Sequence, residues 1–202
     1  VVSEQAAEAD RASGLRKGQH HCRTPDGLDL HCRSWTPQDP RGVLVIVHGL
    51  AEHGGRYRET AEFFAAQGWV VFAGDLRGHG LSPDAPGGGR VHVHRFTDYF
   101  MDVEAFTDVA RQANESLPLF LLGHSMGGLI AISYLLRNPA DLTGAVISSP
   151  ALGAHPEFRP PLALRLRTRG TEPLRDAACV VPVPLHPVRR LQRGFNQAAD
   201  LA

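Results

Sequence analysis

The sequence predicts an α/β fold in which a mostly parallel sheet carries helices on both faces. Three apolar runs, at residues 43–47, 69–73 and 119–122, read as buried strands, and helical patterns separate them. Apolar runs of this kind are typical of parallel strands that are covered on both faces. Strands that alternate with helices also imply right-handed crossovers. We therefore expect one sheet domain over residues 19–153.

The composition is that of a globular protein with a single core. The chain has 202 residues, of which 43% are hydrophobic and 21% are charged, and no apolar run approaches the length that spans a bilayer. The formal net charge is zero, which argues against nucleic acid as a partner. No metal or organic cofactor is implied.

The first 18 residues are polar and have no apolar central region, so they do not form a secretory signal and are expected to be disordered. Alternating segments follow at residues 20–23 and 28–35, on either side of Thr24-Pro25-Asp26-Gly27. Proline presets φ and glycine accepts a positive φ, so this tetrapeptide predicts a turn. The segment is therefore expected to be a β-hairpin that leads into the main sheet.

The three cysteines, Cys22, Cys32 and Cys179, form an odd set without the spacing of metal ligands. We interpret them as free thiols in a reducing compartment, which places the protein in the cytoplasm. A bridge between Cys22 and Cys32 across the hairpin is the less favoured alternative.

The strand expected at residues 43–47 runs into His48-Gly49-Leu50-Ala51-Glu52-His53-Gly54-Gly55-Arg56-Tyr57. Its His-Gly pair opens a loop in which backbone N–H groups can approach a ligand. An amphipathic helix is expected next, over residues 57–67, and Gly68 should end it.

The strand at residues 119–122 runs into Gly123-His124-Ser125-Met126-Gly127, and a helical pattern follows up to residue 137. This is the strand, turn and helix context of a G-x-S-x-G nucleophile elbow. Glycines on either side of Ser125 let the backbone bend sharply, and the helix directs its free N–H groups toward an oxyanion. The alternative is that this five-residue pattern occurs by chance and has no catalytic role.

Two further elements complete the expected domain. A helix over residues 96–116 should end at Leu117-Pro118 and bury Met101, Val103, Phe106 and Val109. A last buried strand is expected at residues 142–149.

Three motifs in order resemble the α/β-hydrolase family of monoacylglycerol lipases and lysophospholipases, which are serine aminopeptidase-like hydrolases. The motifs are the His48 loop, Gly74-Asp-Leu-Arg-Gly-His-Gly-Leu-Ser82 and Gly123-His-Ser-Met-Gly-Gly128. The resemblance covers about residues 26–153. It implies an α/β-hydrolase fold that is truncated before its last strands. It also implies that the loop of Asp75, Arg77 and His79 is structural.

The same resemblance implies a serine ester hydrolase that acts on lipid esters through a Ser125 acyl-enzyme. The backbone N–H groups of Leu50 and Met126 would form the oxyanion hole. The implied substrate is a small lipid ester. The basic segment described next favours a solvated surface, with peripheral contact to a membrane as the alternative. The oligomeric state is unknown from the sequence.

Beyond Pro150 the composition changes. Residues 150–202 hold eight of the fifteen prolines, and residues 157–193 hold eight arginines against three acidic residues. We read residues 154–177 as a cap-like or linker segment. Residues 178–202 form a separate fragment, in which residues 179–202 resemble the ComF family of phosphoribosyltransferase-like proteins. A strand at 178–183 and a helix at 193–201 are expected there.

The triad acid and base cannot be identified from the sequence. After Ser125 the order Ser, Asp and His is available as Asp176 and His186, but their spacing does not fit the ends of successive strands. Two alternatives to an active esterase therefore stay open. One is an inert partial hydrolase domain that acts as a binding fold. The other, least supported because the phosphate-ribose loop is missing, is a phosphoribosyltransferase-like protein.

Overall fold

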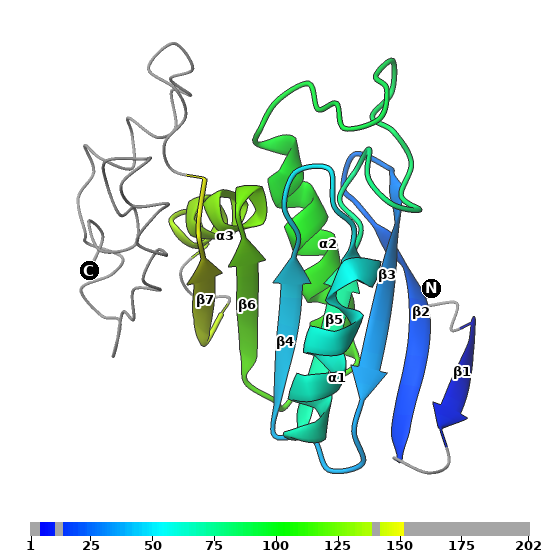
Figure 1. Ribbon diagram of the computed structural model, residues 1–202. Helices are drawn as coiled ribbons and strands as arrows, with labels where there is room; N and C mark the ends of the chain where they lie inside the picture. The colour runs from blue at the N-terminus through cyan, green and yellow to red at the C-terminus, as the bar shows by residue number, and fades with distance from the viewer. Residues whose placement is uncertain (1–4, 11–13, 139–141, 152–202) are drawn as a thin grey trace, which may run out of the picture.

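The computed structural model describes residues 5–10, 14–138 and 142–151, and within this part the strands form one seven-stranded sheet in the order β1-β2-β3-β5-β4-β6-β7 (Figure 1). The strands are β1 (Gln5–Asp10), β2 (Leu15–Arg23), β3 (Asp29–Thr36), β4 (Gly42–Val47), β5 (Trp69–Gly74), β6 (Leu119–His124) and β7 (Gly144–Ser148).

The sheet has an antiparallel half and a parallel half. Strands β1, β2, β3 and β5 pair antiparallel in that order, whereas β5, β4, β6 and β7 pair parallel. The predicted α/β fold is therefore confirmed, and the expected hairpin is the β2–β3 pair. Because β4, β5 and β6 run parallel, their carboxyl ends lie at one edge of the sheet.

The helices cover both faces of the sheet, as predicted (Figure 1). Helix α1 (Arg58–Ala66), which follows the short 3₁₀ helix η1 (Gly54–Tyr57), packs on one face through Ala61 and Ala65. Helices α2 (Asp98–Gln112) and α3 (Met126–Leu135) pack on the other face. Alternate strand residues therefore enter two cores: Val45 packs under α2 and α3, and Ile46 packs under α1.

Helix α2 is shorter than the predicted span of 96–116, because residues 113–116 turn toward Pro118. Within it, Val103 and Phe106 are fully buried, whereas Met101 and Val109 are half-buried. The predicted apolar stripe is therefore correct at its centre, but the buried face of α2 is wider, since it also includes Tyr99, Phe100, Ala105 and Ala110.

Within residues 1–18, which were predicted to be disordered, the described residues 5–10 and 15–18 lie in strands. Strand β1 pairs antiparallel with β2, and β2 already begins at Leu15. Backbone N–H and C=O groups pair in a sheet whatever side chains they carry, so a polar composition does not prevent a segment from extending a sheet edge.

Strand β7 is the second difference. It is shorter than the predicted span of 142–149, and it is not buried, since Val146 keeps 53% of its surface exposed. Among the described residues β7 pairs with β6 alone, so one side of the strand lacks a neighbour there.

Cys22 and Cys32 are buried free thiols, as expected, and the bridge between them is not formed. No helix within the described ranges is both long enough and apolar enough to cross a membrane. The cap-like segment 154–177, the fragment 178–202, Cys179, Asp176 and His186 lie outside the described residues.

Candidate active site

Ser125 lies at a sharp turn between β6 and α3, in the position predicted for it. Its backbone has φ 53° and ψ −117°, a conformation that side-chain-bearing residues rarely adopt. The Ser125 N–H donates to the Ser148 carbonyl at 3.0 Å, and the Ser125 carbonyl accepts from Leu129 and Ala151 at 3.2 and 3.0 Å. Strand β7 and the first turn of α3 therefore hold the strained residue in place.

The two glycines that flank Ser125 are required by close packing. A Cβ atom on Gly123 would lie 2.5 Å from the Gly127 carbonyl oxygen. A Cβ atom on Gly127 would lie 2.1 Å from the carbonyl oxygen of Val47, at the end of β4. The small residues thus allow α3 to begin directly against β6 and β4, which brings the turn next to the loop after β4.

This loop starts beside the serine. A Cβ atom on Gly49 would lie 3.3 Å from Cβ of Ser125. Residues 49–52 form a turn in which the Glu52 N–H donates to the Gly49 carbonyl at 3.3 Å and Ala51 has a positive φ of 56°. Leu50, the second residue of the turn, keeps 58% of its surface exposed.

His48 fixes the first peptide of the turn. Its Nε2 atom accepts from the Leu76 N–H at 3.0 Å, so the proton of the neutral ring is on Nδ1, which donates to the Gly49 carbonyl at 2.8 Å. Burial lowers the pKa of His48 to about 4, which keeps the ring neutral. Since a trans peptide points its N–H opposite to its C=O, the Leu50 N–H points away from His48 and is free to meet another acceptor.

Asp75, at the end of β5, is fully buried and connects the loops at this edge of the sheet. Its carboxylate accepts from the Gly54 N–H at 2.6 Å, the Leu81 N–H at 2.9 Å and Arg33 at 3.0 Å. Burial alone would raise the pKa of Asp75, but these donors and the nearby His31 ring hold it well below its usual value. The residue therefore acts as a structural anion.

Arg77 extends the same network. It is buried, and its guanidinium binds the buried Asp102 of α2 through Nε at 2.8 Å and Asp26 of the β2–β3 turn through Nη1 at 2.7 Å. The buried His79 ring approaches the Arg77 carbonyl through Nδ1 at 2.9 Å. The structural role expected for Asp75, Arg77 and His79 agrees with these contacts.

Ser125 has no hydrogen-bonded proton acceptor within the described residues. None of the imidazoles within the described ranges is hydrogen-bonded to the Ser125 hydroxyl, and the neighbouring His124 contacts the Ser148 hydroxyl at 3.1 Å instead. Asp176 and His186 lie outside these ranges.

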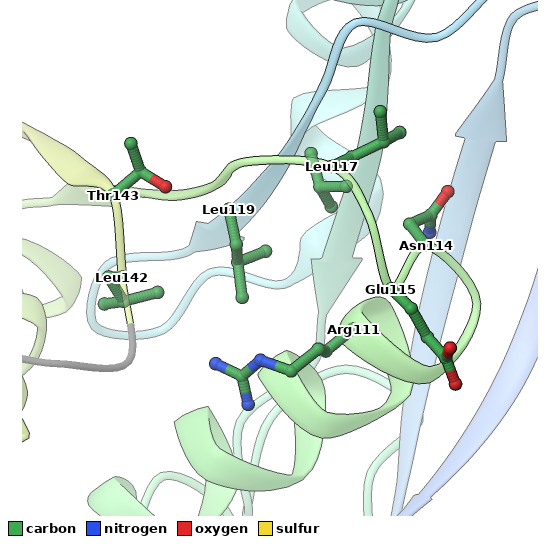
Figure 2. Close-up of a pocket in the computed structure, with 8 residues that line it drawn as sticks. Arg111, Asn114, Glu115, Leu117, Leu119, Leu142 and Thr143 are labelled. Carbon is green, nitrogen blue, oxygen red and sulfur yellow. The ribbon is translucent and has the colours of Figure 1, made fainter.

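A pocket of about 210 Å³ lies at the opposite end of the sheet (Figure 2). Leu119, which begins β6, and Leu117 line it together with Arg111, Asn114 and Thr143. Ser125 follows the other end of β6, so this pocket is separate from the candidate active site.

The sequence interpretation did not single out Glu52 or Tyr57. The Glu52 carboxylate accepts from the Gly49 N–H and from the Tyr57 hydroxyl, so both residues shape the loop beside Ser125. The available signal was an acidic residue three positions after Gly49, which is a common arrangement for a side chain that closes a turn onto a backbone N–H.

The comparisons with known proteins agree with this geometry. The model of the family described as serine aminopeptidase, S33, matches residues 38–180. A monoacylglycerol lipase from Mycolicibacterium smegmatis is 39% identical over 155 residues, which are 76% of this chain and 54% of that protein. The phospholipase YtpA of Bacillus subtilis is 41% identical over 139 residues, which are 68% of this chain and 50% of that protein.

Among solved structures, the monoacylglycerol lipase of Paleococcus ferrophilus superposes with a TM-score of 0.53 at 29% identity, over 78% of this chain and 56% of that one. The chain thus spans about half the length of the relatives that it matches. The fold is that of α/β-hydrolases. None of these findings supports the resemblance of residues 179–202 to the ComF family.

Proposed function

Because this chain belongs to the serine aminopeptidase, S33, family of α/β-hydrolases, we propose that it is a serine hydrolase that cleaves carboxylic esters of lipids through Ser125. The observation that carries the proposal is the strained Ser125 turn between β6 and α3, which lies against Gly49 at the start of the loop after β4. A serine held in this way presents its hydroxyl at the carboxyl edge of the sheet, beside backbone N–H groups.

The substrate class is proposed from the relatives. Proteins named monoacylglycerol lipase and phospholipase align with 76% and 68% of the chain, and the family model covers both loops of the candidate site. A monoacylglycerol or a lysophospholipid, each a small lipid with one carboxylic ester, fits both names. Peripheral contact with a lipid surface and a cytoplasmic location belong to the same proposal.

In the proposed reaction the Ser125 oxygen attacks the ester carbonyl carbon. The carbonyl oxygen becomes an oxyanion, which the N–H groups of Leu50 and Met126 would bind. Collapse of this intermediate expels the alcohol and leaves an acyl-enzyme, which water then hydrolyses. The serine proton requires an imidazole base with an orienting carboxylate. Asp176 and His186 follow Ser125 in that order, but their spacing does not fit the ends of successive strands.

A fluorophosphonate probe tests the proposal, since it reacts only with an activated serine. We expect stoichiometric labelling of Ser125, and hydrolysis of a p-nitrophenyl ester that Ser125→Ala abolishes. Ser116→Ala, at an exposed serine that ends the segment after α2, is the matched control and should retain both activities. Folded wild-type protein that neither labels nor hydrolyses would overturn the proposal and favour an inert binding domain.

A further inference from the structure

Glu52 ties together the two ends of the loop that follows β4. Its Oε2 atom accepts from the Gly49 N–H at 3.0 Å and from the Tyr57 hydroxyl at 2.8 Å. Gly49 begins the turn that contains Leu50, and Tyr57 ends η1. One carboxylate oxygen therefore holds the start of the turn against the last residue of η1.

Gly49 is held from both sides as a result. Glu52 accepts its N–H, while its carbonyl accepts from Nδ1 of His48 at 2.8 Å and from the Glu52 N–H at 3.3 Å. The peptide between Gly49 and Leu50 cannot rotate without breaking the two bonds to its carbonyl, and the peptide before it cannot rotate without breaking the bond from the Gly49 N–H to Glu52. The positive φ of Ala51 costs free energy, so the turn needs such contacts to persist.

The carboxylate also lies close to the proposed nucleophile. A Cβ atom on Gly49 would lie 3.2 Å from Oε2 of Glu52 and 3.3 Å from Cβ of Ser125, so both side chains lie against Gly49. A negative charge so near a developing oxyanion would oppose its formation. The contribution of Glu52 must therefore come from the hydrogen bonds that it accepts and not from its charge.

The ionisation states fit this role. Burial alone would raise the pKa of Glu52, but the bonds from Gly49 and Tyr57 hold it below its usual value. Burial and the contact with Glu52 raise the pKa of Tyr57, so its hydroxyl stays protonated and donates.

We infer that Glu52 is a positioning residue: by accepting from Gly49 and Tyr57 it holds the Leu50 N–H in the direction required to bind the oxyanion. This inference rests on the proposed function, in which the Leu50 N–H is one of the two donors. Substrate binding should not depend on Glu52, whereas the rate of acyl transfer should.

Kinetics of ester hydrolysis with three variants and a control test the inference. Glu52→Ala removes the acceptor and should lower kcat by about 10- to 100-fold with KM changed by less than about twofold. Glu52→Gln keeps a carbonyl acceptor and removes the charge, so it should restore kcat to within a few-fold of wild type. Tyr57→Phe should fall between them, and Glu59→Ala, at an exposed acid of α1, should behave as wild type.

Two kinetic outcomes would overturn the inference. A Glu52→Ala variant with unchanged kcat would exclude any positioning role. A Glu52→Gln variant as slow as Glu52→Ala would mean that the charge, or proton transfer by the carboxylate, is what the reaction needs.

Amide hydrogen exchange separates this test from the test of the proposed function, because it needs no turnover. In Glu52→Ala the Gly49 amide, which donates to Glu52, should exchange on the order of 10-fold faster than in wild type, and in Glu52→Gln it should remain protected. An inactive wild-type protein with this exchange pattern would refute the esterase and keep the loop assignment. Unchanged exchange in Glu52→Ala would refute the assignment itself.

Discussion

The Leu76 backbone N–H donates to Nε2 of His48 at 3.0 Å, which joins the loop after β5 to the loop after β4. This bond requires a ring nitrogen without a proton, and the Gly49 carbonyl takes the proton of the other nitrogen at 2.8 Å. A protonated ring would have to break the bond to Leu76 inside a fully buried site. The conformation of the candidate oxyanion loop is therefore linked to the neutral state of one buried histidine.

The first prediction is that stability falls on acidification because of His48. Its pKa lies at about 4 in the folded chain, against 6.5 for an unperturbed histidine, so between these values the unfolded chain binds a proton that the folded chain does not. The free energy of unfolding should fall as the pH falls through this window, by at most about 3 kcal/mol.

Urea denaturation at several pH values in that window measures the effect. His48→Asn cannot titrate, so this variant should be less stable than wild type at neutral pH and should depend less on pH. If the free energy of unfolding changed with pH by the same amount in both proteins, the pH dependence would come from groups other than His48.

The local motifs were readable from the sequence because their geometry is set by neighbours along the chain. Gly123, Ser125 and Gly127 specify the elbow through a few backbone atoms, and Gly68, with its positive φ of 83°, ends the segment after α1 as predicted. Strand β1 and the exposure of β7 depend on which segment lies beside them in the sheet. That information is not local, so periodicity did not reveal it.

The candidate site was likewise predictable where it depends on local motifs and strand order, and not where it depends on contacts within the folded loop. Ser125 and the loop containing Leu50 lie next to each other as expected, because the ends of adjacent parallel strands meet at one edge. The contact of Glu52 with Gly49 has a local signal in its spacing of three residues, whereas the contact with Tyr57 follows from a turn whose third residue has a positive φ, which no pattern in the residue types indicates.

Strain at the elbow leads to a second prediction. Ser125→Gly should be more stable than Ser125→Ala by about 1 kcal/mol, because glycine tolerates the φ and ψ of this position and alanine does not. Both variants should lose the fluorophosphonate label. The same pair of substitutions at Ser116, which has no positive φ, is the control, and there glycine should bring no gain. Equal stabilities of the two Ser125 variants would show that the turn is not strained.

A third prediction concerns the packing of α3 on β4. Gly127→Ala should lower the free energy of unfolding by about 3 kcal/mol, because the new Cβ would lie 2.1 Å from the Val47 carbonyl oxygen and neither backbone can move away freely. Gly89→Ala is the matched control, since nothing lies within 4 Å of its Cβ position, and it should be close to neutral. Chemical denaturation of both variants measures the two free energies of unfolding. If both variants lost only a small and similar amount of this free energy, the tight approach of α3 to β4 would be contradicted.

The last prediction distinguishes the two carboxylates that bind Arg77. Asp102 is fully buried and accepts from Nε, Nη2 and the backbone N–H of Arg77 at 2.8, 2.7 and 3.0 Å, whereas the Asp26 side chain is 35% exposed. Asp102→Ala would leave a buried guanidinium and a buried N–H short of acceptors, so it should cost roughly 3–5 kcal/mol of unfolding free energy.

Asp26→Ala should cost only about 1 kcal/mol, because water can reach the guanidinium from the side that Asp26 leaves. Asp108→Ala removes an exposed i,i+3 pair with Arg111 at 3.6 Å and serves as the surface reference, with almost no effect. If the Asp26 and Asp102 variants unfolded at the same urea concentration, burial would not be what separates the two contacts. All three carboxylates bind an arginine, so the ranking of Asp102 above Asp26, and of Asp26 above Asp108, follows from solvent access and from the additional backbone N–H that Asp102 accepts.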